Sequence, residues 1–501
     1  MLFEKNNGEG ESKMSKTRRC SAALLALLML AATACGGEAA DTGTTASASG
    51  GETQAAGGYD YGGKNYGGYE FKVLSFDKYV SYIDLDFAEY TGESLDDAVY
   101  DRNRKVEDAL NFRFKEVETP YTGWKTGQVA MIDQVIQSVM AGDYAYDAAY
   151  LPVAFKAGVI TDGYLYDLKT LPGLKLDEEY WDHKINDSLE FGGKLYAASS
   201  PLQFQTMDMA DVLLFNEDLF TDMKLEYPYQ LVRDGKWTLD AMQKYVTALT
   251  QLNGDDSFQF NAEGNAQYGI AYHSDLVFAM TASSGCVMAE KTADGGISLT
   301  LENERWHNTV DKLNIMFNKT NGHAEGSTDV TAANNYINMF RSRRAGFLTA
   351  ELKATLELRD MNDNFGLLPM PKYDETQAEY ITMTGYSTTL LTVPKTQTDP
   401  ERTGAILDAL SYESWKNVLH VYYDVTIEQK GLRNEDSIEM LDIIREGRTA
   451  EFTRVLGITN TYVTSLYNMI LSGSNTLASL AASNKTALET SIKTVVDAMA
   501  K

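Results

Sequence analysis

Cysteine, histidine and proline are scarce in this 501-residue chain, which has 3, 5 and 9 of them. Cys20 and Cys35 lie near the N-terminus, so Cys286 is the one thiol in the body of the chain. A single thiol cannot form an internal disulfide, and a large apolar core has to supply the stability instead. The 44% of hydrophobic residues allow such a core, in which we expect Cys286 as a small buried residue.

Motifs for metal binding and catalysis are also missing. The histidines show no H-E-x-x-H spacing, C-x-x-C does not occur, and Ser284 before Gly285 is not part of a G-x-S-x-G elbow. Carboxylate pairs such as Asp84 and Asp86 are too common in an acidic chain to indicate a glycosidase by themselves. The sequence therefore predicts no metal site, no cofactor and no enzyme activity.

Positive charge is in short supply as well. The chain has 44 Lys and Arg against 71 Asp and Glu, a net charge of −27. A surface this acidic repels phosphate backbones and anionic lipid head groups. We therefore expect no nucleic-acid partner and no electrostatic docking on a membrane.

The N-terminus has the pattern of a targeting signal. Lys16, Arg18 and Arg19 precede an apolar run over residues 22–32, which is too short to span a bilayer. The small residues 32–34 then lead into Cys35 and resemble the lipobox of bacterial lipoproteins, with Ala32 where Leu is usual. This resemblance implies that residues 1–34 are removed and that Cys35 carries a lipid; plain secretion with cleavage nearby is the alternative. Translation can start at Met1 or at Met14.

A tether follows in the sequence-based prediction. Residues 35–68 are rich in Gly, Ala, Thr and Ser and have no apolar periodicity, which is typical of a flexible linker. Within them, GYDYGGKN at 58–65 approximates a phosphate-binding loop. It lacks the Ser or Thr that holds Mg²⁺ and the flanking strand and helix, so we reject a nucleotide site.

The body opens with a strand–helix alternation. We expect a strand at 71–76, a helix from a capping box at Ser94 and Asp97, a strand at 112–117, a helix at 128–140 closed by Gly142, and a strand at 147–151. This order favours a parallel sheet covered by helices, with its ligand-facing edge at the C-terminal ends of the strands. A further strand at 194–198 leads into a polar crossing at 199–211. A strand at 212–215 follows and ends on Asn216, a good helix N-cap.

A second set of elements follows this crossing. Thr238 is the expected N-cap of a helix, with Trp237 and Met242 spaced as a hydrophobic staple and Asp240 in the first turn. We interpret these residues as structural and not as ligand contacts. The remaining expected elements are strands at 268–272 and 346–350, helices at 303–317 and near 336–340, a return crossing at 381–393 around Gly385, helices at 401–410 and 418–422 on the first part, and helices at 437–444 and 477–499 on the second.

Several short segments resemble, in their order and spacing, the extracellular solute-binding proteins, family 1, of bacterial ABC importers. They include GKLY at 193–196, LFNEDLF at 214–220, GKWTLDAM at 235–242 and FGLLPMPKY at 365–373, and the likeness extends from about residue 69 to the C-terminus. It implies an α/β, two-lobed periplasmic-binding-protein-like fold of type II, each lobe a mostly parallel sheet flanked by helices and joined to the other by a hinge. Lobe 1 then comprises residues 69–199 and 388–430, and lobe 2 comprises residues 200–387 and 431–501.

Tyrosine is abundant, with 30 residues against 19 Phe. Tyr79 and Tyr82 follow the first strand, and Tyr144, Tyr146 and Tyr150 surround the third. Aromatic faces stack on the C–H faces of sugar rings while neighbouring polar groups bind the hydroxyls, which favours a carbohydrate ligand. The alternative is that many of these tyrosines belong to the core.

The resemblance also implies positions for ligand contacts. Tyr150 falls in the loop after the third strand, Asp208 in the first crossing, and His273 and Asp275 after a strand of lobe 2. Glu351 follows Ala350, where some members have a stacking Trp, which argues against a long linear maltodextrin. Tyr462 or Tyr467 supplies an aromatic contact in the last third. With Tyr79 and Tyr82, these residues form the predicted ligand site.

The expected function is that of a monomeric, lipid-anchored receptor on the outer face of the cytoplasmic membrane. It would capture a small solute, an oligosaccharide or sugar derivative, and deliver it to the permease of an ABC importer. Two alternatives stay open: a cell-surface polysaccharide hydrolase or lyase, and a sensor or adhesion lipoprotein with the same fold.

Overall fold

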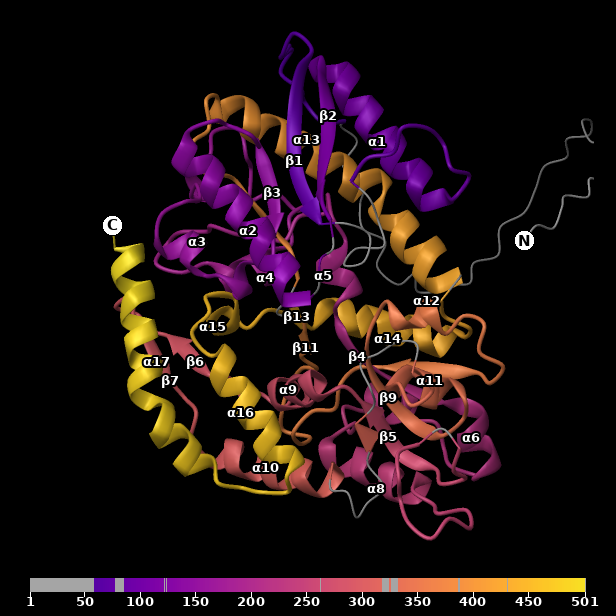
Figure 1. Ribbon diagram of the computed structural model, residues 1–501. Helices are drawn as coiled ribbons and strands as arrows, with labels where there is room; N and C mark the ends of the chain where they lie inside the picture. The colour runs from indigo at the N-terminus through magenta and orange to yellow at the C-terminus, as the bar shows by residue number, and fades with distance from the viewer. Residues whose placement is uncertain are drawn as a thin grey trace, which may run out of the picture. The chain divides into compact units, whose positions relative to one another are not determined.

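Two separate β-sheets carry the architecture of the chain (Figure 1). The structure is a computed structural model, and it describes residues 58–76, 85–120, 122, 124–261, 263–317, 324–325, 332–385, 388–429 and 431–500. The unit Tyr59–Lys501 is compact. Cys35, Tyr79 and Tyr82 lie outside the described residues, as does the expected signal segment.

The first sheet has the strand order β12-β3-β1-β2. Its strands are β1 (Tyr69–Phe76), β2 (Phe112–Thr119), β3 (Ala148–Leu151) and β12 (Leu390–Thr392). β1 runs parallel to β2 and β3, and β12 runs antiparallel to β3. The helices α1 (Ser94–Leu110), α2 (Trp124–Ala141) and α13 (Pro400–Asn417) flank this sheet (Figure 1). The predicted strand–helix alternation is confirmed.

The start of α1 differs from the expected capping box. The N-cap is Glu93, and its side chain makes no cap hydrogen bond. Asp97 instead accepts from the backbone N–H groups of Thr91 and Gly92, at 2.8 and 3.2 Å. The carboxylate therefore holds the turn that leads into α1 and does not cap the helix itself.

The second sheet has the order β10-β4-β9-β5-β8 and is mixed. Its strands are β4 (Asp211–Asn216), β5 (Tyr268–Tyr272), β8 (Ala324–Glu325), β9 (Ala345–Glu351) and β10 (Phe365–Leu368). β5 is parallel to β8 and β9, whereas β4 is antiparallel to β9 and β10. The two-lobed α/β fold is thus as predicted: β8, β5, β9 and β10 run in one direction, and β4 alone runs against them. β4 begins at the edge of the sheet where β9 ends.

The chain passes between the two sheets three times. It leaves the first sheet after β3 to form β4, returns after β10 to form β12, and leaves again after the π-helical turn η5 (Val421–Gln429) to form α14 (Glu435–Glu446), which contacts β10. β11 (Thr382–Met383) and β13 (Arg448–Thr449) pair between the sheets (Figure 1). β11 and β12 flank Gly385, as expected for the return crossing.

The predicted strand at 194–198 does not form. Its residues make two isolated bridges, Lys194 with Phe191 and Ala198 with Leu391. The Ala198 N–H donates to the Leu391 carbonyl at 2.9 Å, and the Ala198 carbonyl accepts from the Leu391 N–H at 2.8 Å. The side chains of this segment alternate as in a strand, but only Ala198 pairs with β12.

In the second part of the chain, two helices begin at the N-cap residues that the sequence predicts. Asn216 accepts from the Leu219 amide at 2.8 Å to cap α6 (Glu217–Asp222), and Thr238 accepts from the Ala241 amide at 3.3 Å to cap α8 (Leu239–Leu249). Trp237 is fully buried and donates its Nε1–H to the Pro369 carbonyl at 3.0 Å. The predicted helix start at Thr238, with Trp237 packed in the core, is confirmed.

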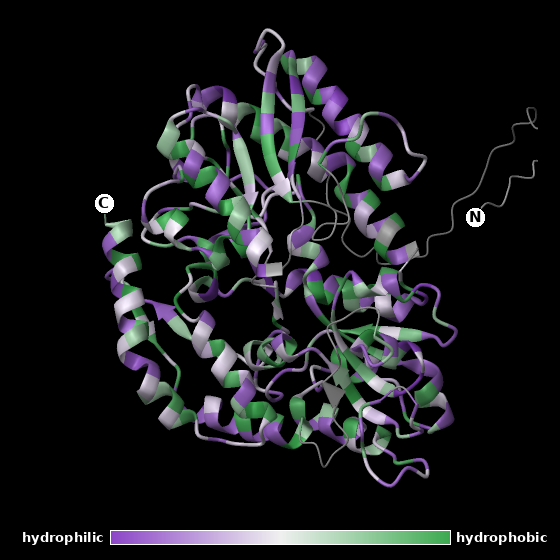
Figure 2. Ribbon diagram, in the orientation of Figure 1, coloured by the Kyte–Doolittle hydropathy of each residue, from purple (hydrophilic) through white to green (hydrophobic). Residues whose placement is uncertain are grey.

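Other helices complete the second part of the chain. They include α5 (Gln205–Asp208), α9 (Ser274–Ser283), α10 (Glu304–Met316), α11 (Tyr336–Arg341), α15 (Phe452–Val455), α16 (Asn460–Leu471) and α17 (Leu477–Met499). α17, which alternates hydrophilic and hydrophobic residues (Figure 2), contacts α16 but also α3 (Gly158–Thr161), which follows β3. α17 therefore packs against elements of both the first and the second part of the chain, and not, as expected from the sequence, against the second part alone. Among the described helices, none combines the length and hydrophobicity that a bilayer span requires.

The end of the expected tether belongs to the folded body. Tyr59 donates to Asp408 at 2.7 Å and Tyr61 donates to Glu413 at 2.8 Å, and both acceptors lie on α13. Lys64 of the loop-like motif pairs with Glu401 at 3.0 Å. Residues 59–66 thus pack through tyrosine rings and their hydroxyl groups, a mode that a search for apolar periodicity does not detect.

The cap of α8 gives a direct test of the fold. Replacing Thr238 with Ala should lower the free energy of unfolding by about 1 kcal/mol, because the Ala241 amide loses its acceptor. Thr238→Ser keeps the hydroxyl and serves as the control. Urea unfolding followed by far-UV circular dichroism measures both, and equal losses for the two variants would contradict the assigned cap.

Candidate functional site

The predicted tyrosine contacts do not come together in the described residues. Tyr150 lies inside β3, opposite Leu391 of β12, and not in the loop after the strand. It is 1% exposed. Burial raises the pKa of its hydroxyl, against the opposing effect of the nearby Ser200 hydroxyl. A solute would reach this ring only after displacement of core packing.

Tyr462 and Tyr467 both lie on α16. Tyr462 is buried, and burial together with the charge of Glu302 raises the pKa of its hydroxyl. Tyr467 is half-buried against the core. No contact found within the described part of the chain joins either tyrosine to Asp208 or Glu351.

The polar members of the predicted site, in contrast, meet at one edge of the second sheet. We call this the crossing edge: it is where β5 ends at Tyr272, β9 ends at Glu351, and β4 begins at Asp211. Asp208, the last residue of α5, reaches the crossing edge, and its backbone carbonyl accepts from the Lys353 amide at 3.1 Å. His273 and Asp275 follow β5 directly.

Asp208 is a buried carboxyl group with one short hydrogen bond. The Tyr422 hydroxyl donates to it at 2.6 Å, and the Tyr422 ring stacks on Phe204 with centroids 5.0 Å apart. Burial raises the pKa of Asp208 to about 6, with Tyr422 and Lys353 opposing and Glu351 adding to the shift. At neutral pH this site therefore holds a carboxylate that binds a proton more readily than usual.

Glu351 and Lys353 form an ion pair at 2.8 Å on the exposed side of the cluster, with 26% and 23% of their side-chain surface accessible. Burial lowers the pKa of Lys353, but Glu351, Asp208 and Glu357 outweigh burial and raise it above its ordinary value. Directly opposite Glu351 in the antiparallel ladder is Asp211. Burial raises the pKa of Asp211 well above its ordinary value, and the charges of Glu351 and Asp275 add to this shift while Arg454 opposes it.

His273 caps the helix that starts at the crossing edge. Its Nδ1 accepts from the Asp275 amide at 3.3 Å, and its ring centroid lies 5.9 Å from that of Tyr336, the first residue of α11. The His273 and Asp275 side chains keep 28% and 38% of their surface accessible. Burial, followed by the charges of Glu351 and Glu357, raises the pKa of the Tyr336 hydroxyl. A ring face and polar groups thus lie beside the carboxylates.

Sequence analysis did not identify five residues at or beside the crossing edge: Asp211, Tyr336, Lys353, Tyr422 and Arg454. A signal existed for Asp211, which is a charged residue at the start of the strand DVLLFN and is followed by four apolar residues. Tyr422 gave no such signal, because its partner Asp208 lies 214 positions away.

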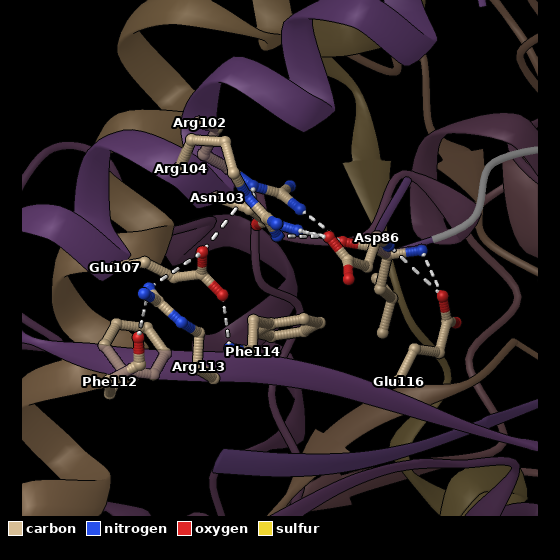
Figure 3. Close-up of polar contacts among 10 residues, drawn as sticks. Asp86, Arg102, Asn103, Arg104, Glu107, Phe112, Arg113, Phe114 and Glu116 are labelled. Atoms are coloured by element: carbon tan, nitrogen blue, oxygen red, sulfur yellow. Dashed lines mark hydrogen bonds and ion pairs between the residues drawn. The ribbon is translucent and has the colours of Figure 1, made fainter. Parts of the chain in front are cut away.

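A second polar network holds the far end of the loop between β1 and α1 (Figure 3). Glu116 of β2 accepts from the amides of Leu85 and Asp86 at 2.8 and 3.2 Å, and Asn103 of α1 donates to the Asp86 carboxylate at 2.8 Å. Arg104 pairs with the same carboxylate at 2.9 Å. These contacts fix Leu85 and Asp86 against β2 and α1.

Arg102 links this network to the first crossing. Its fully buried guanidinium donates to the carbonyls of Leu85 at 2.7 Å and Leu202 at 3.2 Å, and to the Ser414 hydroxyl of α13 at 3.1 Å. Burial lowers its pKa to about 10. One side chain thereby joins α1, α13 and the segment that leads to β4.

Metal binding finds no support at the crossing edge. Across the described residues, no group of three or more His, Cys, Asp or Glu side chains is arranged to hold a metal ion. The carboxylates are spread along strand and helix ends, and Lys353 already pairs with Glu351.

Comparison with known proteins shows the fold. Neither a scan against models of protein families nor a search of curated proteins finds a match. Solved structures do match. One is the GacH receptor of Streptomyces glaucescens, which was solved unliganded and with acarbose. It is 14% identical with a TM-score of 0.53, and the match covers 84% of this chain and 99% of that chain. The maltose/maltodextrin-binding domain MalE from Bdellovibrio bacteriovorus bound to maltotriose is 13% identical with a TM-score of 0.53, covering 85% and 100%.

An ABC substrate-binding protein from Listeria monocytogenes in complex with cycloalternan is 14% identical with a TM-score of 0.51, and the match covers 86% of this chain and 99% of that chain. At this level of identity the likeness establishes the fold. The chain has the two-lobed α/β fold of the ABC substrate-binding proteins.

The raised pKa of Asp208 predicts a pH-dependent stability. Because the folded state binds the Asp208 proton more tightly than the unfolded state, this group stabilises the fold most below its unfolded pKa of 3.8. That contribution is lost as the pH rises through about 6. Between pH 3.8 and about pH 6, the free energy of unfolding of wild type should therefore fall by roughly 3 kcal/mol relative to that of Asp208→Asn. Thermal unfolding at a series of pH values measures the difference.

A control separates this effect from general charge repulsion. Asp256 is exposed in a loop, so Asp256→Asn should follow the wild-type pH profile. Identical profiles for wild type and Asp208→Asn would show that the folded state does not perturb the Asp208 carboxyl.

Proposed function

We propose that this protein is the extracellular solute-binding receptor of an ABC importer and that its solute is an oligosaccharide or sugar derivative. The observation that carries the proposal is the crossing edge. Partly accessible hydrogen-bonding groups from α9, α11 and the end of β9 gather there, between two sheets that the chain joins by three passes. The fold, shared with proteins solved with acarbose and maltotriose, supports it.

The chemistry of the crossing edge suits sugar hydroxyl groups. Carboxylates such as Glu351 and Asp275 accept from O–H groups, Lys353 donates to ring and hydroxyl oxygens, and the rings of His273 and Tyr336 offer faces for C–H groups. Several linkers between two bodies allow hinge motion, and a permease that recognises the closed form would distinguish loaded from empty receptor. The proposed lipid at Cys35 would keep the receptor at the outer face of the membrane.

An enzymatic alternative has one specific observation in its favour. Asp208 and Asp211 both have raised pKa values beside other carboxylates, which is how hydrolases prepare a general acid. Receptor and hydrolase differ in the products that they leave. Incubation of the protein with any saccharide that it binds, followed by mass spectrometry, should return the saccharide intact; shorter products would establish the hydrolase or lyase.

Ligand-dependent stabilisation tests the receptor function. In a thermal-shift panel of mono- and oligosaccharides, polyols and peptides, at least one saccharide should raise Tm by about 3 °C at roughly 100 times its Kd. Asp275→Asn should weaken this saccharide about tenfold, because it removes a charged acceptor from the crossing edge. The unliganded Tm should change little, since Asp275 is partly exposed.

The matched control is Glu302→Gln. Glu302 faces His307 at 4.0 Å, as Asp275 faces His273, but it lies beside Tyr462. The Glu302→Gln variant should bind the saccharide with unchanged affinity. Equal weakening by both variants would move the site away from the crossing edge, and a panel without any stabilising saccharide would overturn the proposed function.

A further inference from the structure

Within the part of the chain that the structure describes, Asp211 differs from the other carboxylates of the crossing edge because its side chain makes no hydrogen bond and no ion pair. It is 7% exposed, yet no residue in the described part of the chain hydrogen-bonds to its side chain or pairs with it. Asp208 is satisfied by Tyr422, and Glu351 is paired with Lys353. Burial without a donor disfavours the ionised form of this carboxyl group, so that in the unliganded protein it holds a proton more tightly than an ordinary Asp does.

The position of Asp211 increases this disadvantage. The register of β4 and β9 sets it directly opposite Glu351, and like charges at directly opposed positions of an antiparallel pair repel. Asp275 on α9 adds a further negative charge, and Arg454 on α15 is the cation whose field opposes them. Asn would fill the same space without a charge. The packing of the protein therefore gives no reason for an acid at this position.

Charge around Asp211 remains unbalanced after the neighbouring cations are counted. Four carboxylates, those of Asp208, Asp211, Asp275 and Glu351, share the crossing edge with the cations Lys353 and Arg454. Of these, Asp275, Glu351 and Lys353 are partly accessible, so a bound solute can contact the cluster from that side. The missing component is a positive charge that also donates hydrogen bonds.

We propose that Asp211 selects a solute with a protonated amino group, so that the preferred ligands are amino sugars and their oligosaccharides. This inference rests on the proposed function and names the substrate class of the same site. An ammonium group supplies both the charge and the N–H donors that the Asp211 carboxylate lacks, and charge-assisted hydrogen bonds of this kind are the strong ones. A neutral sugar offers donors only and leaves the charge uncompensated.

Pairs of sugars that differ only at position 2 test the proposal by isothermal titration calorimetry. The pairs are glucosamine and glucose, galactosamine and galactose, and the β-1,4-linked trimers of glucosamine and glucose. Wild type should bind the amino member of a pair at least about tenfold more tightly. In Asp211→Asn the two members should bind within about threefold of each other, because the paired charge is gone.

Two further variants separate direct contact from a general electric field. Asp256→Asn removes an exposed loop charge and should leave the preference unchanged. Asp208→Asn removes a charge from the same cluster but keeps the acceptor for Tyr422, and it should reduce the preference much less than Asp211→Asn does. Equal reductions by Asp208→Asn and Asp211→Asn would show that no direct pair with Asp211 exists.

Stability of the unliganded variant is the second readout. Asp211→Asn should have a Tm at pH 8 that equals or exceeds that of wild type, because it removes an acid whose ionisation is disfavoured at this buried position. A large loss of Tm would show that the carboxylate serves the fold, and this result would overturn the proposal.

The outcomes distinguish this inference from the proposed function. A neutral saccharide that binds as tightly as its amino counterpart, or a preference that persists in Asp211→Asn, overturns the role of Asp211 and leaves the receptor function standing. If neither these pairs nor the wider saccharide panel bind to wild type, both proposals fall.

Discussion

The direction of β4 is the constraint on which the crossing edge depends. The chain enters the second sheet on this strand, so β4 starts at the edge where β9 ends, and the two run antiparallel. That one pairing sets Asp211 opposite Glu351 and brings the Leu352 amide to the Ala210 carbonyl at 2.9 Å. The end of β5 at the same edge adds His273 and Asp275. A chain that entered in the other direction would leave these carboxylates at opposite ends of the sheet.

Buried charge is handled in two ways in this molecule. Arg102 is removed from water but donates to carbonyl and hydroxyl oxygens of three segments, and Asp408 accepts from Tyr59 and Tyr180. These groups are satisfied and hold the first sheet, α13 and the N-terminal segment together. At the crossing edge the satisfaction is incomplete, because Asp211 has no donor within the described residues. Buried polar groups are normally paired, and the unpaired Asp211 is the observation on which the proposed ammonium contact rests.

Sequence reasoning was most successful where a structure depends on neighbours in the chain. The caps at Asn216 and Thr238, the strand β5 and the limits of α17 follow from local spacing. It failed where a distant partner decides. The strand expected at 194–198 lacks a continuous partner, and residues 59–66 are ordered by α13, about 350 positions away. Tyr150 looked like a loop residue by resemblance, but pairing with β12 places it inside the sheet.

The candidate site divides in the same way. The sequence by itself determined the α/β class, the helix starts and the acidic and aromatic residues near strand ends, because turns, caps and periodicity act over a few residues. Only the tertiary structure decided which of these residues meet, because strand direction and register depend on pairing between segments that are far apart. It moved Tyr150 into the core, joined Tyr422 to Asp208, and left Asp211 buried opposite Glu351.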